Sequence, residues 1–179
     1  MTAQAEPVPP AVSGVARVLG RITGQDRAVA ILAGALRAPV HAYLFVGPAG
    51  TGKRGAALAF AAGLLCPRGG CGDCPVCHDV LAMRHPDVTL AERKGAALTV
   101  EEARAIGALA QRTPRLGSRQ VLVLADLHLV GRAAPVLLKT IEEPPDSTVF
   151  IVLADALSPS FATIASRCLP VEFHPLDVA

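Results

Sequence analysis

Short, mostly apolar runs alternate along this chain with longer segments in which apolar residues recur at helical spacing. Apolar runs of this length are typical of strands that are covered on both faces of a parallel sheet. The pattern predicts strands over residues 41–46, 87–91, 121–124, 149–153 and 169–173.

The segments between these runs predict helices. They cover residues 25–37, 54–65, 80–83, 100–111 and 133–143. In the first of them, Val29, Leu32 and Leu36 form an apolar face. Thr99 is a suitable N-cap for the fourth, because Glu102 follows three residues later as in a capping box. Strands that alternate with helices predict an α/β fold with a parallel sheet covered on both sides.

The composition fits one domain and argues against a surface that grips nucleic acid. The chain has 179 residues, enough for a proper core, and 51% of them are apolar. It has no Trp, one Tyr and a net charge of only +2, so a direct DNA-binding module is the least favoured class. We expect a single domain over residues 15–179 without internal repeats.

The first 14 residues are rich in Pro and Ala and predict a disordered arm. They lack the basic start and apolar stretch of a secretory signal, and no later run approaches the roughly 18 apolar residues of a membrane span. We therefore expect a cytoplasmic protein with no membrane partner. In that compartment, clustered cysteines more often hold a metal than form disulfides.

A glycine-rich loop follows the first predicted strand and precedes the second predicted helix. It consists of Gly47, Pro48, Ala49, Gly50, Thr51, Gly52 and Lys53. In the pattern G-x-x-x-x-G-K-[ST], backbone N–H groups and the lysine bind phosphates, and the final hydroxyl holds Mg²⁺. Here Arg54 stands in the last position, and it cannot ligate magnesium. The loop predicts an ATP or ADP site with doubtful magnesium binding; the alternative is a plain strand-to-helix turn.

The acidic pair that such ATPases place at the end of an apolar strand is incomplete. Asp126 follows the strand 121–124, but Leu127 stands where a second acid would activate water. His128 could act as a base, although a lone histidine at a strand end is more often structural. We therefore expect ATP hydrolysis to be weak or absent.

Four cysteines follow the predicted helix 54–65, within residues 66–77. They are Cys66, Cys71, Cys74 and Cys77. The spacing C-x4-C-x2-C-x2-C suits four thiolates around one tetrahedral Zn²⁺, with no open position for catalysis. The interpretation is a structural zinc knuckle; disulfides or free thiols are the alternatives. Cys168 lies far away in the sequence and is expected to be a packed thiol.

These motifs occur together with three further signatures. They are the stretch 41–45 (HAYLF), the stretch 138–145 (LKTIEEPP) and Ser166-Arg167-Cys168. In this combination the chain resembles the clamp-loader subunits of bacterial DNA polymerase III, over about residues 16–176. Gly24-Gln25 resembles the adenine-side motif of that family, and His85-Pro86-Asp87 also falls where a family motif is found.

The resemblance implies an AAA+ nucleotide-binding domain of the P-loop NTPase class, built on a five-stranded parallel sheet. The ATPase subunits, gamma and tau, keep the hydroxyl after the lysine and an Asp-Glu pair, so this chain is more similar to the delta-prime type. The implied partners are gamma/tau and delta, and indirectly the sliding clamp and primed DNA. The implied activity is that of a component of a nucleotidyltransferase holoenzyme.

The resemblance also assigns a role to Arg167, as an arginine finger that reaches the ATP of a neighbouring subunit. The alternative is an ordinary surface salt bridge. Asp155 stands where the family often has a small polar phosphate sensor, and its charge would repel a γ-phosphate.

The chain stops soon after the last predicted strand, so the helical lid and the collar domain of the family are expected to be absent. A fragment and a truncated relative are both compatible with this pattern. Two other functions stay open: an active gamma/tau-type ATPase, and a free-standing nucleotide-binding regulator.

Overall fold

The chain folds around one parallel sheet. The computed structural model describes residues 16–159 and 161–176, so the predicted arm 1–14 lies outside the described residues. The strands are β1 (Ala42–Val46), β2 (Val88–Ala91), β3 (Gln120–Leu124), β4 (Thr148–Ala154) and β5 (Leu169–Glu172). All neighbours are parallel and the order is β2-β3-β4-β1-β5, which confirms the predicted five-stranded parallel sheet.

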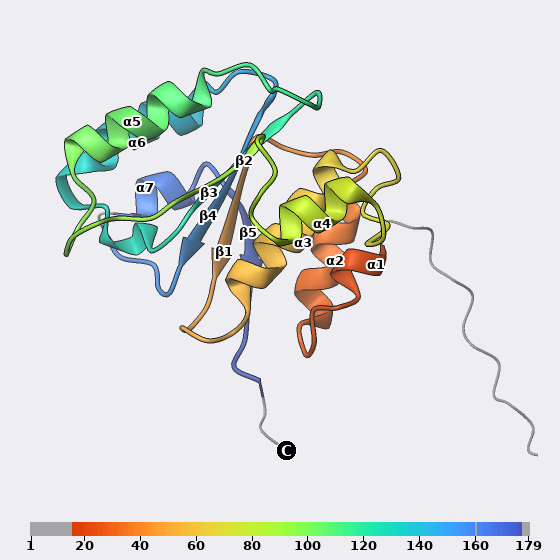
Figure 1. The fold of residues 1–179 in the computed structure, drawn as a ribbon. Coiled ribbons are helices and arrows are strands. Elements are labelled where there is room, and N and C mark those ends of the chain that lie inside the picture. Colours follow the sequence, from red (N-terminus) through yellow and green to blue (C-terminus); the bar gives the residue numbers. More distant parts are fainter. Residues whose placement is uncertain (1–15, 160, 177–179) are drawn as a thin grey trace, which may run out of the picture.

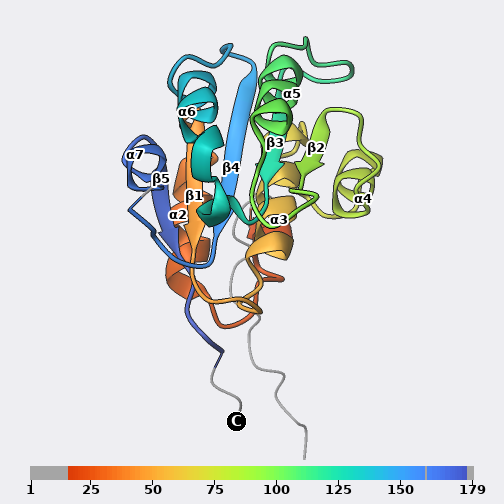
Figure 2. The ribbon, with the colours of Figure 1, turned by 90° about the vertical axis from the view of Figure 1, so that its left-hand side faces the viewer.

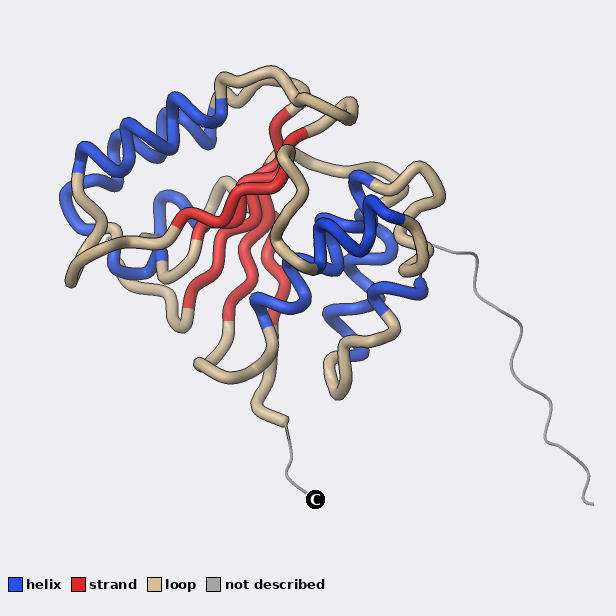
Figure 3. The backbone as a smooth tube through the Cα atoms, viewed as in Figure 1, coloured by secondary structure: helices blue, strands red, loops and turns tan. Residues whose placement is uncertain are grey.

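Helices cover both faces of this sheet. The α-helices are α1 (Ala16–Leu19), α2 (Asp26–Ala35), α3 (Lys53–Leu65), α4 (Pro75–Leu81), α5 (Val100–Ala110), α6 (Ala134–Glu142) and α7 (Ala162–Ala165). Helices α1 to α4 pack on one face and α5 to α7 on the other, as Figures 1 and 2 show. In Figure 3 the strands lie between these two helical layers.

Alternate residues of the central strands supply two separate cores. In β1, Tyr43 and Phe45 point toward the layer of α1 to α4, while Leu44 joins the core beneath α5 to α7. Because both faces are covered, every residue of β3 and β4 is buried, which explains why all residues after Gln120 and Thr148 in these strands are apolar. Phe60 of α3 packs edge-on against Tyr43, with ring centroids 4.7 Å apart.

Most element boundaries agree with the predicted ones, and the capping box of Thr99 and Glu102 is present at the start of α5. The helix predicted over residues 80–83 was placed wrongly. It begins at Pro75, inside the cysteine segment, because Cys74 caps it and Pro75 suits the first helical position. Helices α1 and α7 were missed, since four residues are too few to display a periodicity.

Asp87 fixes the turn that leads into β3. Its carboxylate accepts backbone N–H bonds from Arg115, Leu116 and Gly117. Burial raises the pKa of Asp87, but these three donors outweigh it and lower the pKa below its usual value. Within residues 16–159 and 161–176, no helix has the length and apolar character needed to cross a bilayer.

Candidate functional site: a phosphate-type loop and a cysteine cluster

The glycine-rich loop connects β1 to α3 at the carboxyl edge of the sheet, where ligands bind in open parallel sheets. Gly47 lies against β5: a Cβ added there would come within 2.1 Å of the carbonyl oxygen of Phe173. Gly52 is the N-cap of α3 with a φ of 84°, a left-handed conformation that side chains disfavour. The sequence therefore uses glycine at both ends of the turn for different reasons.

Lys53 points back into the loop instead of out to solvent. Its side chain is only 8% exposed, and its Nζ donates to the carbonyl oxygens of Gly47 and Pro48 at 2.5 and 2.7 Å. A third bond, of 2.9 Å, reaches Oδ1 of Asp155, directly after β4. The ammonium group is thus held between the loop and the end of a neighbouring strand.

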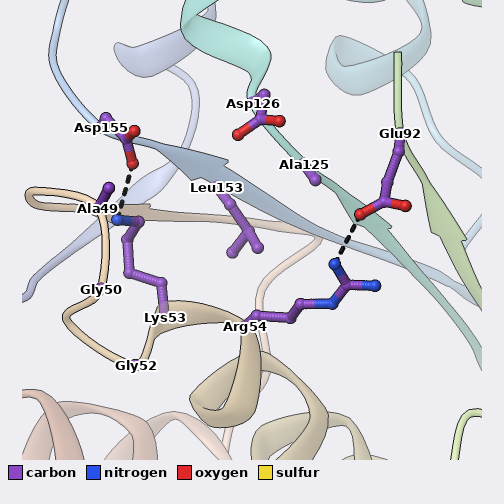
Figure 4. Close-up of a pocket in the computed structure, with 10 residues that line it drawn as sticks. All are labelled: Ala49, Gly50, Gly52, Lys53, Arg54, Glu92, Ala125, Asp126, Leu153 and Asp155. Carbon is purple, nitrogen blue, oxygen red and sulfur yellow. Dashed lines mark hydrogen bonds and ion pairs between the residues drawn. The ribbon is translucent and has the colours of Figure 1, made fainter. Parts of the chain in front are cut away.

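A cavity of about 400 Å³ opens beside the loop. Its walls are Ala49, Gly50, Gly52, Lys53, Arg54, Glu92, Ala125, Asp126, Leu153 and Asp155 (Figure 4). Arg54 extends across its mouth and pairs with Glu92 after β2, with Nη1 and Oε1 2.6 Å apart. No serine or threonine is among the described residues that line the cavity, so no side-chain hydroxyl faces it.

Asp126 projects into the same cavity from the turn that follows β3, where its backbone adopts a left-handed φ of 54°. The next residue, Leu127, is 2% exposed and packs into the core beneath α5 to α7. The side chain of His128 is outside the described part of the structure. The position next to Asp126 therefore offers no second carboxylate to the cavity.

Gln25 ties the loop to the segment after β5. Its amide nitrogen donates to the carbonyl oxygens of Thr51 and His174, and its Oε1 accepts the N–H of His174. The side chain is 4% exposed, so it is almost fully shielded from solvent. The hydroxyl of Thr51 turns inward and donates to the carbonyl oxygen of Pro48. The loop is thus held by its surroundings as well as by its own bonds.

The four predicted cysteines converge at the opposite end of α3. The sulfurs of Cys66, Cys71, Cys74 and Cys77 all lie within 4.8 Å of one another. Those of Cys66 and Cys71 are 3.8 Å apart, and those of Cys66 and Cys74 are 3.6 Å apart. A metal with bonds of about 2.3 Å to four thiolates would hold sulfurs about 3.8 Å apart. The cluster therefore fits a metal ion, and its cysteines are free of disulfides.

The thiols of this cluster have unequal acidities. Burial raises the pKa of Cys66, but backbone N–H groups from Cys71, Gly70 and Arg68 outweigh it and lower the pKa to about 6. Burial raises the pKa of Cys77 to about 12. A bound cation would favour the thiolate form of both. Cys168 is separate and buried beneath α7, and burial raises its pKa to about 12 as expected of a packed thiol.

Arg167 does not line the cavity. It follows α7, pairs through Nε with Glu142 at the end of α6, and donates from Nη1 to the carbonyl oxygen of Thr163 at 2.8 Å. Its side chain is 36% exposed. In the single chain it thus forms a surface ion pair with Glu142.

The structure brings five of the predicted residues 47–54 and Asp126 to one cavity, and the four cysteines to one cluster. The predicted residues Gly47, Pro48 and Thr51 belong to the loop but are not among the residues that line the cavity. Sequence reasoning missed Glu92. The signal was available, because Glu92 directly follows a predicted strand and the carboxyl ends of parallel strands meet at one edge. The contact between Lys53 and Asp155 was also unforeseen, although the charge of Asp155 at this edge was noted.

Comparisons with known proteins agree with this architecture. A family model described as "DNA polymerase III, delta subunit" matches residues 24–177. The subunit delta′ of Pseudomonas aeruginosa is 39% identical over 136 residues, which are 72% of this chain and 42% of that protein. The subunit tau of Escherichia coli is 34% identical over 165 residues, 88% of this chain and 25% of that protein.

Among solved structures, a gamma subunit-related protein of DNA polymerase III from Thermotoga maritima superposes with a TM-score of 0.62 at 18% identity. The match covers 85% of this chain and 47% of that one, and at this identity it shows the fold alone. The chain spans about two fifths of the length of the delta′ relative from Pseudomonas aeruginosa. It belongs to the DNA polymerase III delta subunit family, with relatives of the delta-prime type.

Proposed function

We propose that this protein acts in a DNA polymerase III clamp loader as a subunit that does not hydrolyse ATP. Its companions would be the gamma/tau and delta subunits, which together place the sliding clamp on primed DNA. In that assembly it would supply structural support and an arginine for the ATP site of a neighbour. The proposal extends family membership to the activity of the whole protein.

The proposal that this subunit does not hydrolyse ATP rests on one observation. The cavity has a phosphate loop but lacks the groups that complete an ATPase site. Arg54 stands where a hydroxyl would ligate Mg²⁺, and it is paired with Glu92. Leu127 stands beside Asp126 and is buried in the core. Metal-assisted attack by water would therefore lack both a ligand and a base.

Steady-state phosphate release from ATP tests this proposal. We expect the purified protein at its natural length to show no turnover above background in Mg²⁺ buffer. The Lys53→Ala variant is the control, because it removes the lysine of the loop and should give the same background rate. Turnover in the wild type that this substitution abolishes would contradict the proposal.

An active gamma/tau-type ATPase is the second candidate, because the tau subunit of Escherichia coli is similar over 88% of this chain. This function would require Asp126 alone to organise the metal and the attacking water. The same turnover measurement separates the two candidates, and the composition of the cavity favours the first.

The proposed role of Arg167 rests on its position. It lies outside the cavity of its own chain, it is partly exposed, and its guanidinium is planar and permanently charged. A partner's phosphate would have to compete with Glu142 for this group. Such a residue suits a phosphate bound to a neighbouring subunit better than a ligand in its own pocket.

Reconstitution of a complete clamp loader tests this role. We expect Arg167→Ala to lower the DNA-stimulated ATP turnover of the assembled loader roughly a thousandfold, the lower end of the effect of arginine fingers. Arg84→Ala is the matched control, because Arg84 is an exposed arginine that also pairs with a carboxylate, Asp79. Equal effects of the two substitutions would overturn the role.

For the cysteine cluster we propose one structural Zn²⁺ per chain. Four thiolates without an open coordination position are typical of structural zinc sites. Elemental analysis of protein purified without chelators should find about one zinc per chain. A value near zero would contradict this part of the proposal without affecting the arginine or the loop.

A further inference from the structure

We propose that Asp155 determines which nucleotide the pocket accepts: its carboxylate takes the place of a terminal phosphate and restricts the pocket to diphosphates such as ADP. This inference rests on the proposed phosphate-binding role of the loop. It adds a specificity-determining residue and a ligand class to that role.

The ammonium group of Lys53 already has a full set of hydrogen-bond partners. A lysine ammonium group has three donors. Here they meet three acceptors, the carbonyl oxygens of Gly47 and Pro48 and the carboxylate of Asp155. No donor is left for a phosphate oxygen unless one of these bonds breaks. Two of the acceptors are backbone atoms of the loop itself, so Asp155 is the partner that can be displaced by rotation of a side chain.

The place of Asp155 in the sheet gives the second step. Strand β4 lies directly beside β1, and Asp155 is the first residue after β4. The N–H groups at the start of α3 would hold one phosphate of a nucleotide. A further phosphate beyond it would lie beside Lys53 and face the strand ends. Figure 4 shows the carboxylate of Asp155 in contact with Lys53, and we infer that it takes the place of this further phosphate.

The charges of the cavity give the third step. Its described walls carry three carboxylates, on Glu92, Asp126 and Asp155, but only two cations, on Lys53 and Arg54. Both cations are already paired with carboxylates. A triphosphate would add negative charge next to Asp155 and Asp126, where Arg54 has replaced the hydroxyl that would hold a screening Mg²⁺. A diphosphate needs only the N–H groups of the loop and the nearby charge of Lys53, and it leaves the bond between Lys53 and Asp155 in place.

Calorimetric titration of the full protein with ADP and with ATP, in Mg²⁺ buffer, tests the inference. We expect the wild type to bind ADP more tightly than ATP. Asp155→Asn removes the charge and keeps the shape, so the affinity for ATP should rise roughly tenfold or more, with a change for ADP below about threefold. Asp155→Ala should shift the same ratio in the same direction, and it guards against an effect peculiar to asparagine.

Asp126→Asn is the matched control. It removes a charge from the same cavity, and asparagine tolerates the left-handed backbone of this position. Among the described residues, Lys53 bonds to Asp155 and not to Asp126, so we expect a gain for ATP smaller than that from Asp155→Asn. Equal gains would overturn the specific role of Asp155, as would an unchanged ATP-to-ADP ratio or a wild type that binds both equally.

These outcomes are independent of the proposed lack of hydrolysis. If Asp155→Asn gains ATP affinity while the wild type proves to turn over ATP, the specificity inference stands and the proposed function fails. If the wild type shows no turnover and Asp155→Asn gains nothing, the proposed function stands and the inference fails.

Discussion

The two ends of α3 present opposite kinds of site. The helix has 13 residues, or about 20 Å, and it begins in the phosphate loop and ends one residue before the first cysteine of the cluster. At its start the cavity is open and charged, and Arg54 and Glu92 at its mouth are about half exposed. At its end Cys66, Cys71 and Cys77 are almost completely buried.

This difference indicates which ligand can be exchanged. A pocket open to solvent whose cations are held by displaceable carboxylates allows a ligand to enter and leave. A buried set of four thiolates has no such route, and a metal held there would be part of the folded structure. We therefore expect changes at the cysteine end to affect stability, and changes at the loop end to affect binding. Substitutions at the two ends of α3 can test this division.

Substitution of a cluster cysteine should cause the largest loss of stability. Cys77 is fully buried, so Cys77→Ser would remove one thiolate and leave the other three with an incomplete metal site. We expect the free energy of unfolding to fall by more than about 3 kcal/mol, with loss of bound zinc. Thermal unfolding with metal analysis measures both.

Cys168→Ser is the control for this prediction. Cys168 is a buried thiol that donates to the carbonyl oxygen of Ile164, and a serine hydroxyl can make the same bond. Its substitution should lower stability by about 1 kcal/mol and leave the zinc content unchanged. Similar losses for Cys77→Ser and Cys168→Ser would remove the basis for a structural metal.

Gly47 lies at the loop end of α3, but we expect its substitution to reduce stability. Gly47→Ala would push a Cβ into the carbonyl group of Phe173, which belongs to the backbone and cannot rotate away. We expect a loss of about 3 kcal/mol. Gly52→Ala has no atom within 4 Å of the added Cβ and should lose only about 1 kcal/mol through its positive φ. Denaturant unfolding of the Gly47→Ala and Gly52→Ala variants should separate the effect of close packing from that of backbone conformation. Equal losses of stability would mean that the backbone at Phe173 moves to make room for the new Cβ.

Lys53→Ala should show the reverse behaviour of Cys77→Ser. Of the acceptors that it leaves behind, Asp155 lines the open cavity and is 38% exposed, so water can replace the lysine there. We expect a stability change of about 1 kcal/mol or less, together with loss of ADP binding. Unfolding and titration on the same sample test this contrast. A loss of stability as large as that of Cys77→Ser would contradict the expectation that changes at the loop end mainly affect binding.

Arg54→Thr should have the smallest effect. Exposed ion pairs such as Arg54–Glu92 contribute little, so stability should change by less than about 1 kcal/mol. The substitution restores a hydroxyl for Mg²⁺, but Leu127 still provides no base. We therefore expect ATP turnover to stay at background in a phosphate-release assay. Turnover in this single variant would show that the missing hydroxyl alone disables the pocket.

The sequence predicts features set by neighbouring residues better than features set by the order of the strands. The cysteine cluster could be predicted because its four ligands lie within residues 66–77, and strands β3 and β4 could be predicted because burial on both faces makes them apolar. The start of α4 was missed because Cys74 and Pro75, which cap and begin it, were assigned only to the knuckle.

The ion pairs of the pocket depend on distant residues. Lys53 and Asp155 are 102 positions apart, and Arg54 and Glu92 are 38 apart. Which carboxylate meets which cation follows from β4 lying beside β1 and β2 lying at the sheet edge, an order that local patterns do not contain. The sequence therefore indicated Lys53, Arg54 and Asp155 at this edge, but neither Glu92 nor the pairing of the charges.

The internal bonding of the loop has a kinetic consequence. Thr51, Lys53 and Gln25 hold the turn through bonds to its own backbone and to the segment after β5. The conformational entropy of this turn is therefore lost when the chain folds, and nucleotide binding does not have to order the turn. A diphosphate that occupies the loop leaves the bond between Lys53 and Asp155 in place, so no contact of the turn has to be released when it arrives. Nucleotide association should then be limited by diffusion and charge, not by rearrangement of the backbone.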